Sequence, residues 1–426
     1  MPSIKHYLVR LKSSLRKLSE GQFLLGLVVW DFASKFLRIW SPGEPYFDER
    51  PYYIKAARDY LEGVFTTNPE HPPLAKLIMA AGIKTLGDDP FGWRLPSVIL
   101  GTAGVVATYF LAKRLTGSKK VAALASVLLS FEFGWFVSSR VATLEIYVAS
   151  FLLLGSFFAF RLYQEGKFRD LLLAGIFLGA AFASKWSAVL LIGWLGLFLV
   201  TFWKKRFVVK VGTALLIGLL TLAVYFTSYL PYLSKNSLSE LVELHKWMIS
   251  YHTNIIPEVQ RKIVESRHYQ FHPFPAWSWF LDPPFYYYGK TFGREFSQAI
   301  VFFFNPLVLW GGLAGFVLMT KEQLGKLKPE TVFLLGAFLA QYLPWFLSPR
   351  YTLTYYLLGA MPFFCIAFSL FLRRIWQRDR TWFYALVLAS VCAFLIYYPL
   401  LTALKVPYLY SRIITGVVEF RELLTS

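Results

Sequence analysis

Apolar segments about as long as a membrane is thick recur along most of the chain, and they restrict it to one class of fold. A bilayer core requires about 20 apolar residues per helix, and this length divides the sequence into about eleven spans. Their cores are 22–40, 92–112, 120–138, 143–163, 170–184, 186–203, 208–230, 298–319, 331–347, 353–372 and 382–401. With 56% hydrophobic residues and 41 Phe, the composition excludes an ordinary soluble domain. We therefore expect an all-α polytopic membrane protein.

Clusters of basic residues predict how the spans are oriented. Short basic loops of membrane proteins stay on the cytoplasmic side, and counting spans from a cytoplasmic N-terminus places every cluster there. The clusters are Lys113, Arg114, Lys119 and Lys120; Lys204, Lys205, Arg206 and Lys210; and Arg373, Arg374, Arg378 and Arg380. The net charge of +19 is thus a topology signal, and nucleic-acid binding is not expected.

This orientation sets the expected domain organisation. The N-terminus lies in the cytoplasm, and its first span stays as an anchor because no cleavage site of the signal-peptide type follows it. The C-terminus lies outside, as do a first outer loop at about 41–90 and a large outer loop at about 233–296. Residues 1–426 then form a single transmembrane domain without a separate soluble domain.

Asp48 and Glu49 stand side by side just beyond the first span. Adjacent carboxylates at a membrane are costly unless they are solvated or functional. They precede a predicted short interfacial helix in FDERPYYIKAARDYLEG, whose positive end would favour an ionised Asp48. Such a carboxylate is suited to act as a general base. A helix cap, or a surface salt bridge with Arg50, explains the same residues about as well.

Three cations stand at the outer ends of different spans. They are Arg140, with Glu145 following it in SSRVATLEIY, Lys185 in AFASKWSAV, and Arg350 in YLPWFLSPRYTLTYY. Lys185 lies in the middle of an apolar run and needs a counter-charge. Together the cations could converge on one phosphate or diphosphate, with arginine offering a bidentate fork. Interfacial anchoring is the commoner fate of each cation taken alone.

Two outer segments could complete a site. In NPEHPPLAK, the prolines hold His71 against the membrane with Lys76 one turn into the next helix, which suits an anionic headgroup, although Lys76 could also snorkel. In the large outer loop, His272, Trp277 and Trp279 could form an aromatic wall for a sugar, with an interfacial aromatic belt as the alternative. The histidines show no specific metal-binding spacing, so no metal or other cofactor is expected. The sequence alone does not exclude a bound divalent ion.

Taken in order, several segments resemble the protein O-mannosyltransferase family, which are membrane glycosyltransferases of the GT-C type. The resemblance covers most of the chain. It rests on FDE at 47–49, HPPLAK at 71–76, FGWRLPS at 91–97, SRVATLE at 139–145, SKW at 184–186, HPFPAWSW at 272–279, FNPLVLW at 304–310, and YLPWFLSPR at 342–350 followed by YY and PF. It implies a GT-C fold with the active site outside the cytoplasm.

The resemblance also implies an activity. The enzyme would move mannose or a related hexose from a dolichyl- or polyprenyl-phosphate sugar to a Ser/Thr hydroxyl of extracytoplasmic proteins, with inversion. The reaction needs one general base and no general acid, because a phosphate is a good leaving group when nearby cations neutralise its charge. A lipid or glycan acceptor, as in the aminoarabinose transferases, and a transporter of lipid-linked sugars are the alternatives. The family's eukaryotic lumenal domain is missing, which implies the plasma membrane of a prokaryote. Membrane lipids are expected partners, and a dimer is compatible with the sequence.

Carried over residue by residue, the resemblance assigns roles. Asp48 becomes the base and Glu49 its support. The cations Arg140, Lys185 and Arg350 become candidates for the donor phosphate, and His71, Lys76 and Arg94 for the neighbouring headgroup site. The acceptor or sugar side comprises Glu145, His272, Trp277 and Trp279. Tyr355 and Tyr356 stand where many members have Tyr-His, and this departure puts the acceptor in doubt more than the donor.

Overall fold

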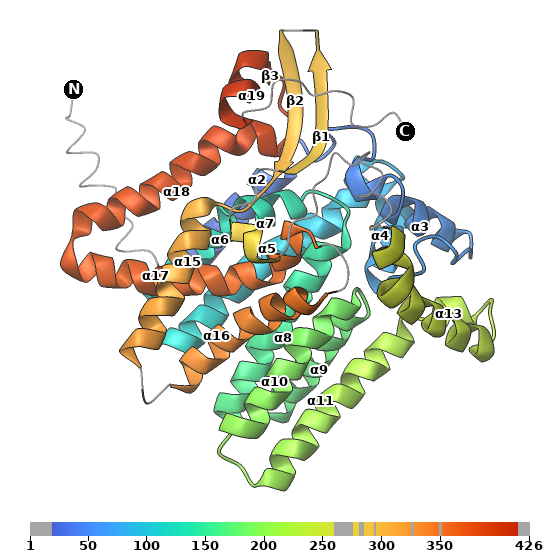
Figure 1. Cartoon of the computed structure of the whole chain (residues 1–426), viewed down its shortest axis with the longest axis horizontal. Helices are drawn as coiled ribbons and strands as arrows, with labels where there is room; N and C mark the ends of the chain where they lie inside the picture. Colours follow the sequence, from blue (N-terminus) through green and yellow to red (C-terminus); the bar gives the residue numbers. More distant parts are fainter. Residues whose placement is uncertain are drawn as a thin grey trace.

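The computed structural model describes residues 19–259, 276–280, 285–293, 295–323, 325, 328–348 and 352–415, and this part of the chain is mostly helical (Figure 1). Six helices of the described chain are long and apolar enough to cross a membrane. They are α5 (Pro90–Thr116), α8 (Leu144–Glu165), α11 (Phe207–Thr227), α16 continued by the 3-10 turn η5 (Pro329–Leu347), η6 continued by α17 (Thr354–Arg378), and α18 (Arg380–Leu401).

The remaining predicted spans correspond to shorter or interrupted helices. They are α2 (Glu20–Phe36), α6 (Lys119–Ser130) with α7 (Phe133–Ser138), α9 (Phe168–Phe182), η2 (Trp186–Ala188) with α10 (Val189–Phe202), and α15 (Pro306–Glu322). The predicted break at Lys185 is confirmed, because Ser184 and Lys185 separate α9 from η2. The number of membrane crossings stays a prediction.

Helices also fill the first outer loop. The short helix expected after Asp48 is confirmed as α3 (Tyr53–Leu61), and α4 (Leu74–Leu86) begins directly after Pro73. On the large outer loop, α12 (Leu230–Leu233) leads into α13 (Leu238–Ser250) and a π-turn, η3 (Tyr251–Ile255). Figure 1 places α3, α4 and α13 together at the right-hand end of the molecule.

A small antiparallel sheet corrects the all-α prediction. Strands β1 (Phe285–Phe292) and β2 (Phe296–Phe302) form a hairpin, and β3 (Val406–Pro407), just before α19 (Tyr408–Thr415), pairs with β2. The predicted span 298–319 was therefore wrong at its start, since α15 begins only at Pro306, after Asn305 caps it. A short apolar run cannot be told from a helix segment by its hydrophobicity alone. Figure 1 shows the hairpin projecting from the top of the helices.

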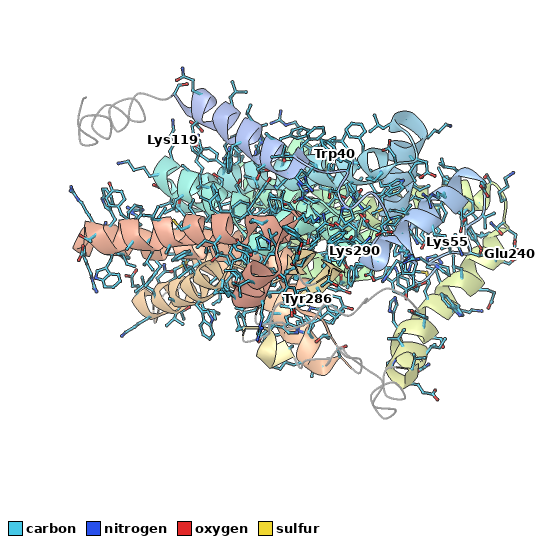
Figure 2. All side chains as sticks on the ribbon, turned by 90° about the horizontal axis from the view of Figure 1, so that it is seen from above. Trp40, Lys55, Lys119, Glu240, Tyr286 and Lys290 are labelled. Atoms are coloured by element: carbon cyan, nitrogen blue, oxygen red, sulfur yellow. The ribbon has the colours of Figure 1, made fainter. Side chains whose placement is uncertain are left out.

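The basic turns and the long loops lie toward different ends of the molecule. Figure 1 shows the α10–α11 and α17–α18 turns at the lower and left edges, away from the hairpin and from α3 and α13. In Figure 2, Lys119 lies near the left end, whereas Lys55 and Glu240 lie near the right end. Lys113 and Lys119 both form ion pairs with Glu20 at the start of α2. The first described helix therefore begins beside the basic α5–α6 turn.

Glycines allow α15 and α17 to pack closely. A side chain at Gly315 would overlap the carbonyl of Ala367, and side chains at Gly311 and Gly312 would overlap phenylalanines of α17. Small residues at helix contacts are the usual device for close packing in membranes, where lipid supplies no hydrophobic drive. This contact fixes α17, and with it the preceding turn η6 that enters the candidate site.

Candidate active site

Asp48 lies in a short 3-10 turn, η1 (Phe47–Glu49), between α2 and α3. Phe47 adopts a left-handed backbone conformation with φ of 49°, and its ring stacks on Tyr287 of β1 with centroids 4.1 Å apart. The structure thus places the hairpin directly over this turn. Within the described chain no hydrogen bond or ion pair involves the Asp48 carboxylate, so the predicted alternative of a salt bridge with Arg50 does not occur there.

The surroundings of Asp48 favour its protonated form. Desolvation is the main cause that raises the pKa of Asp48 to about 7, the negative charge of Glu145 raises it further, and the positive charge of Lys185 lowers it. Asp48 keeps partial access to solvent. A carboxylate that titrates near neutral pH and has no bound partner is poised to accept a proton.

Glu49 has the opposite environment. It is fully buried, and its carboxylate receives Arg94 in a bidentate pair, Nε to Oε1 at 2.9 Å and Nη2 to Oε2 at 2.8 Å. The backbone N–H groups of Ala142 and Tyr46 also donate to it, at 2.7 and 3.3 Å. These bonds tie η1 to α5 and to the α7–α8 connection. Four donated hydrogen bonds therefore occupy the two carboxylate oxygens of Glu49, whereas the carboxylate of Asp48 has none in the described chain.

Arg94 uses its whole guanidinium for structure. Besides Glu49, it donates to the carbonyl oxygens of Ile39, Pro42 and Glu44 at 2.8–3.1 Å. A guanidinium has five N–H donors, and all five are engaged here. Arg94 is also fully buried, so the structure does not present it to the headgroup site in which the sequence places it.

Lys185 and Glu145 meet beside Asp48. Lys185 Nζ lies 2.8 Å from Glu145 Oε1, and both side chains are almost buried, at 10% and 7% exposure. The Lys185 ammonium also lies 4.9 Å from the ring centre of Tyr356 and 5.7 Å from that of Tyr355. Glu145 thus supplies the counter-charge that the sequence required of Lys185. The charges of Lys185 and Glu145 both act on Asp48, which brings three of the predicted site residues together.

A small cavity of about 40 Å³ adjoins this ion pair. Its walls come from α8, from Lys185 and the following η2 and α10, and from α16, η5 and η6. They include Glu145, Lys185, Gln341, Trp345, Tyr355, Tyr356 and Gly359. Sequence reasoning missed Gln341 and Trp345. The available signal was a polar and an aromatic residue at the outer end of an apolar span, in QYLPWF.

Two other predicted phosphate ligands make structural bonds. Arg140 donates to the carbonyl oxygens of Lys35, Leu37 and Arg38 at the end of α2, where it caps the negative end of the helix. Lys76 is fully buried and donates to the carbonyl oxygens of Asn68 and His71. Both cations hold the backbone of the first outer segment in place.

The remaining predicted residues lie on the outer side or outside the described residues. The His71 ring lies 5.5 Å from that of His252, whose Nε2–H donates to the carbonyl of Glu70 at 3.0 Å. Trp279 is buried and its ring centre lies 6.4 Å from that of Tyr356. Arg350, His272 and the side chain of Trp277 fall outside the described residues. In the described chain, no group of three His, Cys, Asp or Glu side chains could hold a metal ion.

Known mannosyltransferases are similar to this chain in sequence. Residues 70–230 match the family model described as dolichyl-phosphate-mannose-protein mannosyltransferase. A polyprenol-phosphate-mannose–protein mannosyltransferase of Corynebacterium glutamicum is 25% identical over 418 residues, covering 80% of this chain and 79% of its own length.

Solved structures share the fold. The S. cerevisiae protein O-mannosyltransferase Pmt1–Pmt2 complex bound to the sugar donor matches with a TM-score of 0.79 at 14% identity, covering 94% of this chain and 92% of the other. ArnT from Cupriavidus metallidurans bound to undecaprenyl phosphate matches with a TM-score of 0.60 at 14% identity, covering 89% and 71%. In its family-model match over residues 70–230 and in its relatives, this chain is similar to the protein O-mannosyltransferases, and its fold is that of GT-C membrane glycosyltransferases.

Proposed function

We propose that this protein transfers mannose from a polyprenyl-phosphate donor to Ser/Thr hydroxyls of extracytoplasmic proteins, with inversion at the anomeric carbon. The family and the Corynebacterium relative support the reaction class. The observation that carries the proposal is the pairing of an unbonded carboxylate, Asp48, with a nearby buried cation, Lys185, beside a cavity. A base for the acceptor and a positive charge for the leaving phosphate are the two groups that this displacement needs.

In this reaction the Asp48 carboxylate accepts the proton of the acceptor hydroxyl. The hydroxyl oxygen forms a bond to the anomeric carbon of the sugar from the face opposite the phosphate. The bond between that carbon and the phosphate oxygen breaks, and its electron pair leaves with the polyprenyl phosphate. No general acid is needed, because positive charge compensates the leaving phosphate.

Lys185 is the described residue best placed to compensate the leaving phosphate. Its ammonium has three N–H donors, and Glu145 Oε1 is its hydrogen-bond partner at 2.8 Å, so donors remain for a phosphate oxygen. Arg350 retains the same proposed role from its sequence position alone. In our proposal Glu49, Arg94, Arg140 and Lys76 position the first outer segment without contacting the donor.

The proposed orientation places this site outside the cytoplasm. Lys113 and Lys119 at the α5–α6 turn lie beside the start of α2, as expected if both face the cytoplasm. Asp48 follows α2 at its other end, beside α3 and β1. We therefore propose about eleven crossings with the catalytic groups at the outer surface, in the plasma membrane of a prokaryote.

The test compares the wild-type protein with Asp48→Asn and with Glu62→Gln, an exposed carboxylate in the same outer segment. Purified protein receives polyprenyl-phosphate mannose and a Ser/Thr peptide, and the mannosylated peptide is measured. We expect Asp48→Asn to bind the donor normally and to lose at least about 10²-fold in turnover, and Glu62→Gln to behave as wild type.

Two results would overturn the proposal. Turnover of Asp48→Asn at the wild-type rate would remove the base from the mechanism. Transfer by the wild type to lipid or glycan, with none to any peptide, would replace the protein acceptor by the alternative that the sequence left open.

A further inference from the structure

Gln341 is a polar residue in an apolar helix, and it lines the cavity next to the Lys185–Glu145 pair. It lies in the last turn of α16 and is 7% exposed. Burying a carboxamide costs free energy unless its polar atoms are hydrogen-bonded. Its presence in this wall therefore calls for a partner.

The carboxamide of Gln341 is only partly satisfied by the protein. Its Nε2 donates to the carbonyl oxygen of Ala337, one turn earlier in the same helix, at 3.0 Å. Within the described chain no hydrogen bond reaches its Oε1. Since a carboxamide offers two N–H donors and an oxygen with two lone pairs, one donor and the oxygen remain available. The bond to Ala337 also fixes which end of the amide is the oxygen.

Gly359 leaves the space that this carboxamide occupies. A side chain at Gly359 would overlap Gln341 Oε1. Gly359 also lines the cavity, and it follows Tyr355 and Tyr356 in the turn η6. Its φ lies outside the left-handed region, so the backbone conformation does not demand glycine. The glycine is explained by close approach of the neighbouring side chain.

We propose that Gln341 hydrogen-bonds a ring hydroxyl of the donor sugar, and that Gly359 fixes the position of its carboxamide, so that this pair selects the hexose. The inference rests on the proposed function and deepens it. A sugar hydroxyl both donates and accepts, which matches the free N–H and oxygen of the carboxamide. Lys185 meets the phosphate charge, whereas the neutral Gln341 is suited to the uncharged ring. A site built to hydrogen-bond a hydroxyl discriminates strongly against analogues that misplace it.

The experiment measures kcat/KM with polyprenyl-phosphate mannose and with polyprenyl-phosphate glucose as competing donors. We expect Gln341→Ala to lower kcat/KM for the mannosyl donor about tenfold, as for one lost hydrogen bond, and to change the mannose-to-glucose ratio by at least about fivefold. Gly359→Ala should shift the ratio in the same direction, although Gln341 is intact, because the added methyl displaces the carboxamide. Gly218→Ala is the matched control, since nothing lies within 4 Å of a side chain there.

Gln341→Asn keeps the carboxamide and withdraws it by one methylene, so it keeps the inference testable if Gly359→Ala fails to fold. Its ratio should also change, with the same melting temperature as wild type. The inference is overturned if wild type transfers mannose and the Gln341 variants keep its ratio. It is also overturned if both donors lose activity equally while the melting temperature falls, because that indicates a structural role. A wild type that uses neither donor would instead refute the proposed function itself, and the inference with it.

Discussion

The buried pair of Glu49 and Arg94 leads to the sharpest prediction for stability. Replacing Glu49 by Gln keeps the shape of the side chain and removes its charge. The Arg94 guanidinium then stays in a fully buried site without a counter-ion. In wild type, Arg94 and the backbone N–H groups of Ala142 and Tyr46 all donate to the two oxygens of Glu49. The glutamine side chain would replace one of these oxygens by an NH2 group, which cannot accept a hydrogen bond from them.

The size of the effect follows from this geometry. Removing one partner of a buried ion pair costs about 3–5 kcal/mol, because the remaining charge is neither solvated nor paired. Neither side chain is exposed, so solvent screening does not reduce this figure. We therefore expect Glu49→Gln to lower the free energy of unfolding by about 3–5 kcal/mol. The adjacent Asp48→Asn should leave it unchanged or slightly higher, because it removes a charge that burial disfavours.

The assay is a double-mutant cycle of Glu49→Gln and Arg94→Met, measured as unfolding free energies in detergent micelles, with Glu62→Gln as the exposed control. We expect the double variant to be more stable than the sum of the single losses predicts, by at least about 1.5 kcal/mol, since partners in contact are coupled. Additive losses, or a Glu49→Gln variant as stable as Glu62→Gln, would refute the assignment of a structural ion pair.

Four further predictions address the site and the packing. Transfer should rise with pH through about 7 as Asp48 ionises. The contribution of Asp48 to stability should fall as pH rises from about 4 to about 7, because its folded pKa lies above the unfolded one, so Asp48→Asn should gain stability relative to wild type over this range. Lys185→Met should weaken donor binding at least about tenfold in equilibrium titrations, as expected for a lost charge-assisted bond, and unchanged affinity would exclude it from the phosphate site. Gly315→Ala should lower the melting temperature through overlap with α17, whereas Gly218→Ala should not, and equal values would contradict the packing described for α15.

The sequence predicted which residues belong to the candidate site better than it predicted the hydrogen bonds and ion pairs between them. An acid pair beyond the first span and a lysine in an apolar run were both visible as charges that need an explanation. The structure brings Asp48, Lys185 and Glu145 together. That Arg94 serves Glu49 was not predictable, because the two residues lie on different elements and their contact depends on how α5 packs against η1.

Periodicity also explains where the fold prediction was wrong. The segment from 298 is apolar because β2 is buried, and a buried strand reads like the start of a membrane helix. Aromatic residues that precede a membrane span are typical of an interfacial belt. Tyr287 and Tyr288 are instead buried in the hairpin, where they contact Phe47 and Tyr46. Contacts between residues this distant in sequence leave no local pattern.

The stacking of Phe47 on Tyr287 also bears on how the protein is made. Residue 287 leaves the ribosome about 240 residues after residue 47, which at 5–20 residues per second takes roughly 10–50 seconds. Glu49 can find Arg94 soon after both are synthesised, so the first outer segment can be anchored early. The ring that covers Phe47 arrives only after these intervening residues have been synthesised. Closure of the hairpin over η1 is therefore a late event of biogenesis, and a chain that stalls before the hairpin would carry Asp48 without its cover.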